Sequence, residues 1–358
     1  MKLAALLLTA SAATAAFAQS PMSPDSSPPP RPRPVATMPA VAAPDMQAVL
    51  TAHASLMPKP IETLTPVQAR IQPSAADAAM KRMRQLGIST APDASVTTRD
   101  MPYGNDSMQF ARVYRPANTP AGPLPVIVYY HGGGWVIADV NTYDVTSRLL
   151  TQQLNAIVVS VEYRTAPEAK FPAQHNDAAA AYRWTLDNAA SWGGDTTRLA
   201  LAGESAGGNL AVATAIYARD NRLPMPRAIL AVYPIADSRT DLPSRHDSAN
   251  AKPLNDAMLN WFGHYYTTSM ADMRDPRLDL VHANLRGLPP VTIVNAQIDP
   301  LRSDGENLAT ALLAAGNRVA QRTFKGVTHE FFGMGKVVRG AHDAEIYAIS
   351  RLRPALAR

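Results

Sequence analysis

From about residue 125 onward, short runs of continuously apolar residues alternate with segments whose apolar positions recur at helical spacing. The apolar runs read VIVYY, AIVVSVEY, RLALAG, AILAVYP, VTIVNAQ and RVAQRTF. Continuous apolar character is typical of strands buried on both faces. Helical segments such as TYDVTSRLLTQQL and SDGENLATALLAAGN lie between these runs. The pattern therefore predicts an α/β fold with a mostly parallel central sheet of about eight strands and helices on both faces.

Other parts of the chain depart from this alternation. Residues 45–94 carry helical spacing interrupted by prolines, and the stretches on either side of residues 104–106 predict a β-hairpin. Residues 236–285 contain no clear strand but include the helical stretch NDAMLNWFGHYY. Its aromatic residues either belong to the ordinary core or pack over a site at the carboxyl ends of the strands. They are Trp261, Phe262, Tyr265 and Tyr266.

The N-terminal residues have the pattern of an export signal. Lys2 precedes the apolar residues 3–8, and residues 16–18 read Ala-Phe-Ala. This pattern predicts a signal peptide (1–18) cleaved after Ala18, and hence a periplasmic or secreted protein. A buried helix or a membrane anchor is the alternative, but an anchor needs about 20 strongly apolar residues. The proline-rich residues 19–44 predict an extended linker, or else a ligand for a proline-binding module.

Composition narrows the classes of function. Hydrophobic residues make up 46 % of the 358 residues and charged residues 18 %, so the chain can form a large core. The net charge of +5 is spread without a block of five Lys or Arg, which argues against nucleic-acid binding. The chain has no cysteine, so no disulfide can form.

A serine lies between one apolar run and the next helical segment. Ser205 is at the centre of GESAG, which fits Gly-x-Ser-x-Gly with a predicted strand before it and a predicted helix after it. That context is the one a nucleophile elbow requires. Gly203 and Gly207 allow the strand and helix to approach closely, so Ser205 is expected in a strained conformation near the helix N-terminus. The alternative is a tight structural turn.

A serine hydroxyl needs a base near neutral pH, and His329 is the histidine we expect in that role. It follows the run RVAQRTF in FKGVTHEFF, at the same edge of the sheet as Ser205. Asp299 follows VTIVNAQ and is expected to orient the imidazole. Asp304 is a rival, but Ser303 or Asp304 is better explained as the N-terminal cap of the next helix. The order Ser205, Asp299, His329 is that of the α/β-hydrolase fold.

Three consecutive glycines follow the run VIVYY in the stretch YYHGGGW. Glycines expose backbone N–H groups, so this loop could hold an oxyanion together with the N–H of Ala206. A merely flexible glycine loop is the alternative. Neither Gly-x-Gly-x-x-Gly opening a helix nor a Gly-Lys-Ser/Thr phosphate loop is present in the sequence.

With these motifs in view, the chain resembles the hormone-sensitive-lipase family of esterases, the bacterial family IV, over roughly residues 45–358. The resemblance rests on HGGGW, VEYRTAPEAKFPA, GESAGGNLA, IDPLRSDGE and GVTHEFFGM. It implies a catalytic domain (95–358) of the α/β-hydrolase fold. A helical cap would come from the N-terminal segment (45–94) and an insertion at about 236–285. It also implies a carboxylesterase for short to medium acyl esters, without cofactor or metal.

Carried onto this sequence, the resemblance makes Ser205 the nucleophile, Asp299 the acid and His329 the base. Gly133, Gly134 and Ala206 would supply the oxyanion donors, with Gly132 as a possible substitute for one glycine.

The chain departs from the family pattern at two positions. Glu204 stands where the family usually has Asp, which keeps the charge. Ser303 stands where relatives often carry an acidic residue, and this change is expected to loosen the loop that carries Asp299. Phe331 and Phe332, together with the aromatic cap, are expected to make the acyl pocket apolar.

The sequence therefore predicts an exported serine carboxylesterase whose partner is a small-molecule ester. We expect no nucleic-acid partner and no stable membrane insertion after signal cleavage, and the sequence makes no prediction of the oligomeric state. One alternative is an amidase or deacetylase with the same triad. Another is a non-catalytic binding protein such as the plant gibberellin receptor, whose branch has lost the catalytic histidine, whereas His329 is present here.

Overall fold

The central feature is an eight-stranded sheet with the strand order β1-β2-β4-β3-β5-β6-β7-β8. The computed structural model describes residues 40–119 and 122–357, so the predicted signal peptide and most of the predicted linker lie outside the described residues. The strands are β1 (Val96–Pro102), β2 (Phe110–Pro116), β3 (Leu124–Tyr130), β4 (Ile157–Glu162), β5 (Gly194–Glu204), β6 (Ala228–Val232), β7 (Val291–Ile298) and β8 (Val319–Thr328). The β1–β2 and β2–β4 pairs are antiparallel and the other pairs are parallel, which confirms the predicted fold class.

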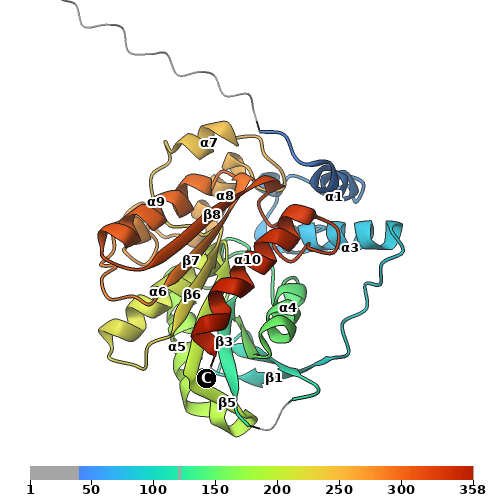
Figure 1. Ribbon diagram of the computed structural model, residues 1–358. Helices are drawn as coiled ribbons and strands as arrows, with labels where there is room; N and C mark the ends of the chain where they lie inside the picture. The colour runs from blue at the N-terminus through green and yellow to red at the C-terminus, as the bar shows by residue number, and fades with distance from the viewer. Residues whose placement is uncertain (1–39, 120–121, 358) are drawn as a thin grey trace, which may run out of the picture. The chain divides into compact units, whose positions relative to one another are not determined.

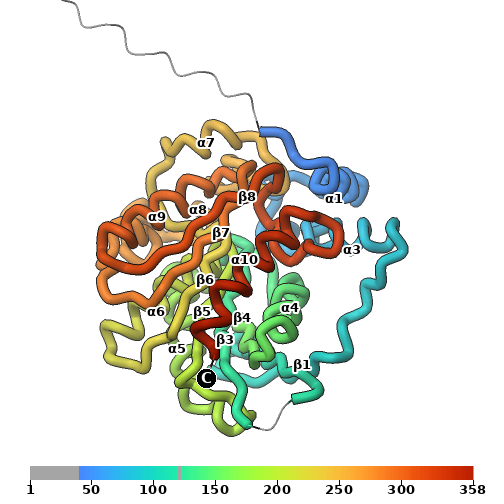
Figure 2. Tube along the Cα trace, viewed as in Figure 1, coloured from blue at the N-terminus to red at the C-terminus, as the bar shows by residue number. Residues whose placement is uncertain are grey.

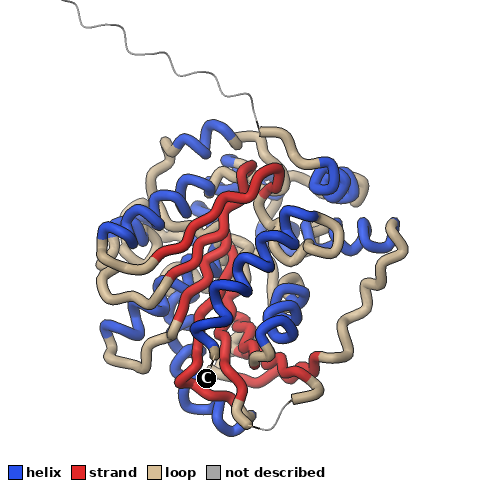
Figure 3. Tube along the Cα trace, in the orientation of Figure 1, coloured by secondary structure: helices blue, strands red, loops and turns tan. Residues whose placement is uncertain are grey.

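Helices cover both faces of this sheet (Figures 1 and 3). Successive residues of a strand point to opposite faces, so Val126 and Val128 of β3 belong to one core and Ile127 to the other. The first core also takes the apolar sides of α5 (Ala173–Asn188), α6 (Ala206–Asp220) and α9 (Arg302–Ala314). The second takes those of α4 (Asp144–Leu154) and α10 (Arg339–Leu356), which pack beside each other (Figure 2).

The N-terminal part of the described chain is helical, as its spacing predicts. It comprises α1 (Pro44–Ala54), the short η1 (Ile61–Thr63), α2 (Pro66–Arg70) and α3 (Ala75–Gln85). Capping boxes at Thr65 and Ser74 begin α2 and α3. The side chain of Arg70 fastens α2 to the segment after β3, because its Nε donates to the carbonyl oxygen of Val136 at 2.9 Å.

The interval between β6 and β7 contains no strand, also as predicted. It forms α7 (Pro243–Asp247), α8 (Asp256–Tyr266) and the short helices η3 (Asp272–Arg274) and η4 (Leu280–His282). The aromatic residues of α8 serve both predicted purposes, because Trp261, Phe262 and Tyr266 are buried in the first core and Phe262 also lines the space above Ser205. The Trp261 indole N–H donates to the carbonyl oxygen of Leu64 at 2.9 Å, and the Tyr266 ring stacks on Trp135 at 4.3 Å. The α8 helix thereby joins the N-terminal helices to the loop after β3.

The predicted hairpin is formed by β1 and β2, whose residues pair in the register Val96 with Pro116 through Pro102 with Phe110. No helix within residues 40–119 or 122–357 has the length and apolar character needed to cross a bilayer.

Candidate active site

Ser205 lies at the sharp turn between β5 and α6. Its φ of 56° and ψ of −118° place it in a strained region for a residue with a side chain. A Cβ at Gly203 would collide with the carbonyl oxygen of Gly207, and one at Gly207 would collide with that of Tyr130. The two glycines therefore permit the close approach that pushes the Ser205 hydroxyl above the sheet, as the sequence pattern predicts.

The structure brings Ser205, Asp299 and His329 together at the carboxyl ends of β5, β7 and β8. The Ser205 hydroxyl lies 3.0 Å from Nε2 of His329, and Nδ1 of His329 lies 2.8 Å from Oδ2 of Asp299. A carboxylate can only accept, so Nδ1 carries the proton and Nε2 is free to accept the proton of the serine hydroxyl. Asp299 is fully buried and its Oδ1 accepts from the backbone N–H of Leu301 at 2.8 Å, which fixes its orientation.

The electrostatic environment of His329 favours the imidazolium. Burial by itself disfavours the charged ring, but the charge and hydrogen bond of Asp299, with the charges of Glu330 and Glu204, raise the pKa of His329 above its usual 6.5. A base with a raised pKa accepts the serine proton more readily.

The glycine loop after β3 faces the same space. Gly133 and Gly134 have φ of 96° and 58° and both line the cavity at Ser205. The carbonyl oxygen of Gly133 accepts from the N–H of Ile137 at 2.9 Å, which closes a tight turn. A Cβ at Gly134 would collide with the ring of Phe262. The aromatic ring therefore packs directly on the loop, at a point where only glycine fits.

Glu204, next to Ser205, anchors a buried network beneath the imidazole. Its carboxylate accepts hydrogen bonds from the hydroxyls of Tyr129, at 2.6 Å, and of Tyr233. The Tyr233 ring lies 4.5 Å from the ring of His329. Burial raises the pKa of Glu204 to about 7, although the tyrosine hydrogen bonds act in the opposite direction. Glu204 stands out in the sequence beside Ser205, but neither tyrosine could be predicted as part of the site, because apolar strand runs commonly contain tyrosine as core.

Two predictions for the segment after β7 are wrong. Asp304 and Ser303 do not cap α9, whose N-terminal flanking residue is Leu301 without a side-chain cap. Asp304 instead pairs with Arg245 of α7 at 3.0 Å. The backbone N–H of Ser244 donates to the hydroxyl of Ser303 at 3.2 Å, and the backbone N–H of Ser303 donates to the hydroxyl of Ser244 at 3.0 Å. The serine therefore ties the loop of Asp299 to α7 rather than loosening it.

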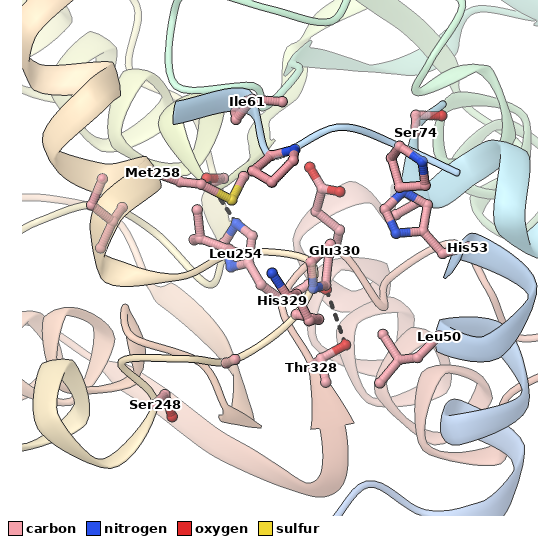
Figure 4. Close-up of a pocket in the computed structure, with 18 of the residues that line it drawn as sticks. Leu50, His53, Ile61, Ser74, Ser248, Leu254, Met258, Thr328, His329 and Glu330 are labelled. Atoms are coloured by element: carbon pink, nitrogen blue, oxygen red, sulfur yellow. Dashed lines mark hydrogen bonds between the residues drawn. The ribbon is translucent and has the colours of Figure 1, made fainter. Parts of the chain in front are cut away.

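A cavity of about 1180 Å³ opens above Ser205 and His329. Its wall comes from the N-terminal helices, from the interval between β6 and β7, and from the glycine loop. Apolar members of the wall include Leu50, Ile61, Leu254 and Met258 (Figure 4). The ring of Phe262 also lines the cavity.

The expectation that Phe331 and Phe332 line this cavity is wrong. Both are buried in the core below it, where the Phe331 ring lies 5.9 Å from that of Tyr233. Of the three described residues that directly follow His329, Glu330 lines the cavity, whereas Phe331 and Phe332 do not.

Comparison with known proteins places these features in a family. Residues 127–333 match the model of a family described as alpha/beta hydrolase fold. Carboxylesterase NlhH of Mycobacterium tuberculosis is 36 % identical over 326 residues, covering 89 % of this chain and 99 % of that protein. Ethyl acetate hydrolase of Pseudomonas putida is 33 % identical over 267 residues, covering 73 % of this chain and 81 % of that protein.

Solved structures give the same result. A thermostable esterase from Pseudomonas putida matches with a TM-score of 0.79 and 30 % identity, over 90 % of this chain and 99 % of that one. An esterase from Pyrobaculum calidifontis matches with a TM-score of 0.74 and 31 % identity, over 86 % of this chain and 99 % of that one. The sheet order, the motifs and these similarities together show that the chain belongs to the α/β-hydrolase esterases of the hormone-sensitive-lipase family.

Proposed function

We propose that this protein is a carboxylesterase that works through an acyl-enzyme intermediate on Ser205. The observation that carries the proposal is the continuous contact from Asp299 through His329 to the Ser205 hydroxyl. In the first step the Ser205 oxygen attacks the ester carbonyl while Nε2 of His329 takes the hydroxyl proton. His329 then gives this proton to the departing alcohol. Water repeats the sequence on the acyl-enzyme and releases the acid.

The backbone N–H groups of Gly133, Gly134 and Ala206 are the proposed donors to the tetrahedral oxyanion. Gly133 and Gly134 line the cavity at Ser205, and Ala206 is the first residue of α6, whose N-terminal N–H groups lack partners within the helix. A Cβ at Gly132 would meet the Tyr143 hydroxyl. Gly132 is not among the residues that line the cavity, which favours the pair Gly133 and Gly134 as donors.

Replacement of the nucleophile tests the proposal. Ser205→Ala is expected to lower kcat on p-nitrophenyl butanoate by about 10⁴- to 10⁶-fold, with the fold intact by circular dichroism. A fluorophosphonate should label the wild type at Ser205 and leave the variant unlabelled. Near-normal turnover by Ser205→Ala would refute the assignment, and faster cleavage of matched anilides than of esters would make the protein an amidase.

We also propose that the protein is exported, on the strength of the N-terminal pattern of Lys2, the apolar residues 3–8 and the Ala-Phe-Ala site. Expression of the full chain in a Gram-negative host, followed by fractionation and N-terminal sequencing, tests this. The expected product is extracytoplasmic and starts at Gln19. An uncleaved protein confined to the cytoplasm would contradict the proposal.

A further inference from the structure

The residue after His329 has an unusual backbone conformation. Glu330 has a φ of 61°, in the left-handed region that glycine adopts far more easily than a residue with a side chain. The Glu330 side chain reaches the wall of the cavity, between His53 on one side and Leu254 and Met258 on the other (Figure 4). A carboxylate is thus held in a strained conformation beside the reacting groups, where glycine would fit without strain.

Little in the described part of the chain neutralises this carboxylate. Glu330 has no ion pair within 4 Å and no side-chain hydrogen bond with any described residue. The basic side chains of the cavity wall are engaged elsewhere or exposed: Nε2 of His53 lies 3.0 Å from the carbonyl oxygen of Pro73, and His246 is exposed. The Arg70 guanidinium pairs with Glu168 at 2.6 Å, while Lys59 and Lys252 are exposed. An apolar cavity that keeps an unpaired carboxylate is electrostatically complementary to a positively charged group.

The position relative to His329 indicates which part of an ester meets Glu330. His329 must hand its proton from Nε2 to the oxygen of the departing alcohol, so the alcohol portion leaves past the imidazole. Glu330 follows His329 directly in the chain and lies on the cavity wall with it. An alcohol portion that leaves past the imidazole therefore passes along the wall that carries Glu330.

Resting on the esterase function proposed above, we propose that Glu330 is a specificity-determining residue that selects esters whose alcohol portion carries a cation, such as a quaternary or primary ammonium. The carboxylate attracts the ammonium, while the surrounding apolar residues contact its alkyl groups. An acetylated or butyrylated amino alcohol has this chemistry, and its hydrolysis releases a free amino alcohol and a carboxylic acid.

A pair of isosteric substrates tests the proposal. One is butyrylcholine, and the other is its neutral isostere, in which a carbon atom replaces the quaternary nitrogen. The readout is the ratio of their kcat/KM values, compared between wild type and variant so that their different intrinsic reactivity cancels. Glu330→Gln is expected to lower this ratio by about tenfold, and high salt should lower the ratio in the wild type. Glu330→Gly, which suits the local φ, should lower it equally.

Two matched variants serve as controls. Asp187→Asn removes an exposed carboxylate from α5, outside the cavity, and should leave the ratio unchanged. Glu62→Gln removes a second wall carboxylate that lacks an ion pair among the described residues, whereas Asp77, a third, accepts hydrogen bonds from Ser74 in the capping box of α3. If Glu62→Gln lowers the ratio and Glu330→Gln does not, the assignment to Glu330 is overturned. It is also overturned if no variant changes the ratio while p-nitrophenyl butanoate is still hydrolysed. Loss of all ester hydrolysis in the wild type would instead refute the esterase function itself.

Discussion

Three carboxyl groups act electrostatically on the imidazole of His329, and one of them, that of Asp299, is hydrogen-bonded to it. Asp299 accepts a hydrogen bond from Nδ1–H of this ring, and Glu330 follows His329 in the chain. Glu204 is held by hydrogen bonds from Tyr129 and Tyr233. Negative charge from all three raises the pKa of His329. A general base must be unprotonated to act, so activity is expected to fall as the pH drops through this raised pKa.

Removal of the Glu204 charge should shift the pH at which activity falls on the acidic side of the pH–activity profile, which is called the acid limb. Glu204→Gln takes away one of the groups that raise the pKa of His329, so the limb in a plot of kcat/KM against pH is expected to move to lower pH. Stopped-flow or steady-state assays with a neutral ester at constant ionic strength measure it. Asp343→Asn, at an exposed position of α10, is the control and should leave the limb in place. A limb that stays fixed in Glu204→Gln would show that Glu204 has no electrostatic influence on the base.

The meeting of Ser205, Asp299 and His329 could be predicted from the sequence because each directly follows a strand-like run, and parallel strands end at one edge. The prediction that Asp304 caps α9 is wrong because a capping rule considers only neighbouring residues. The ion-pair partner of Asp304, Arg245, lies far away in the chain. The cavity position of Glu330 could not be predicted either. It depends on a φ of 61°, and no pattern of apolar and polar positions reveals a single backbone angle.

At the scale of elements, α2 and the glycine loop are joined by one side chain. The Arg70 guanidinium donates to the carbonyl oxygens of Val136 and Ala166, at 2.9 and 2.7 Å, and pairs with Glu168. These contacts hold the N-terminal wall of the cavity against the loop that faces Ser205. Since α2 has only five residues and cannot be stable alone, its position depends on them.

Loss of these contacts is therefore expected to affect substrate binding. Arg70→Ala should raise KM for a neutral ester and lower kcat/KM by about tenfold, because each lost hydrogen bond contributes roughly 1 kcal/mol. Arg82→Ala on α3, which loses only an exposed hydrogen bond to Gln85, is the matched control. Equal kinetics for the two variants would mean that the wall does not rely on Arg70.

Strands were predicted best where both faces are buried, as in β3, β4 and β6. The beginning of β5 was not predicted. That strand starts at Gly194 with the polar residues 195–197, and its pairing with β3 shifts in register between Pro125 and Val126. Polar residues before a bulge lack the continuous apolar pattern, so only the apolar part of β5 could be predicted from the sequence.

At the scale of the whole molecule, a buried acid links stability to pH. Glu162 ends β4, and burial raises its pKa to about 8 although its carboxylate accepts from the Val140 N–H at 2.9 Å. A carboxyl group with a raised pKa binds its proton more tightly in the folded chain. Stability therefore falls as the pH rises from the unfolded value, near 4.5, to about 8.

Glu162→Gln should remove this dependence, since the amide oxygen can still accept from the Val140 N–H. Between pH 5 and pH 8 the Tm of the variant is expected to fall less than that of the wild type, by about 4 °C or more. Differential scanning calorimetry at matched ionic strength measures the two curves. Parallel curves would mean that Glu162 does not ionise differently in the folded and unfolded chain.

Two stretches outside the sheet, one before β1 and one between β6 and β7, supply most of the cavity wall, whereas the groups proposed to react sit on the ends of strands. The residues proposed to react and most of the residues that shape the cavity thus lie in different segments of the chain. Evolution, or an engineer exchanging those two pieces together between homologues, can retune which alcohol and acid are accepted without disturbing the reacting atoms. Exchange of the stretch between β6 and β7 alone would have to keep Trp261, whose indole N–H donates to the carbonyl oxygen of Leu64 and joins the two stretches.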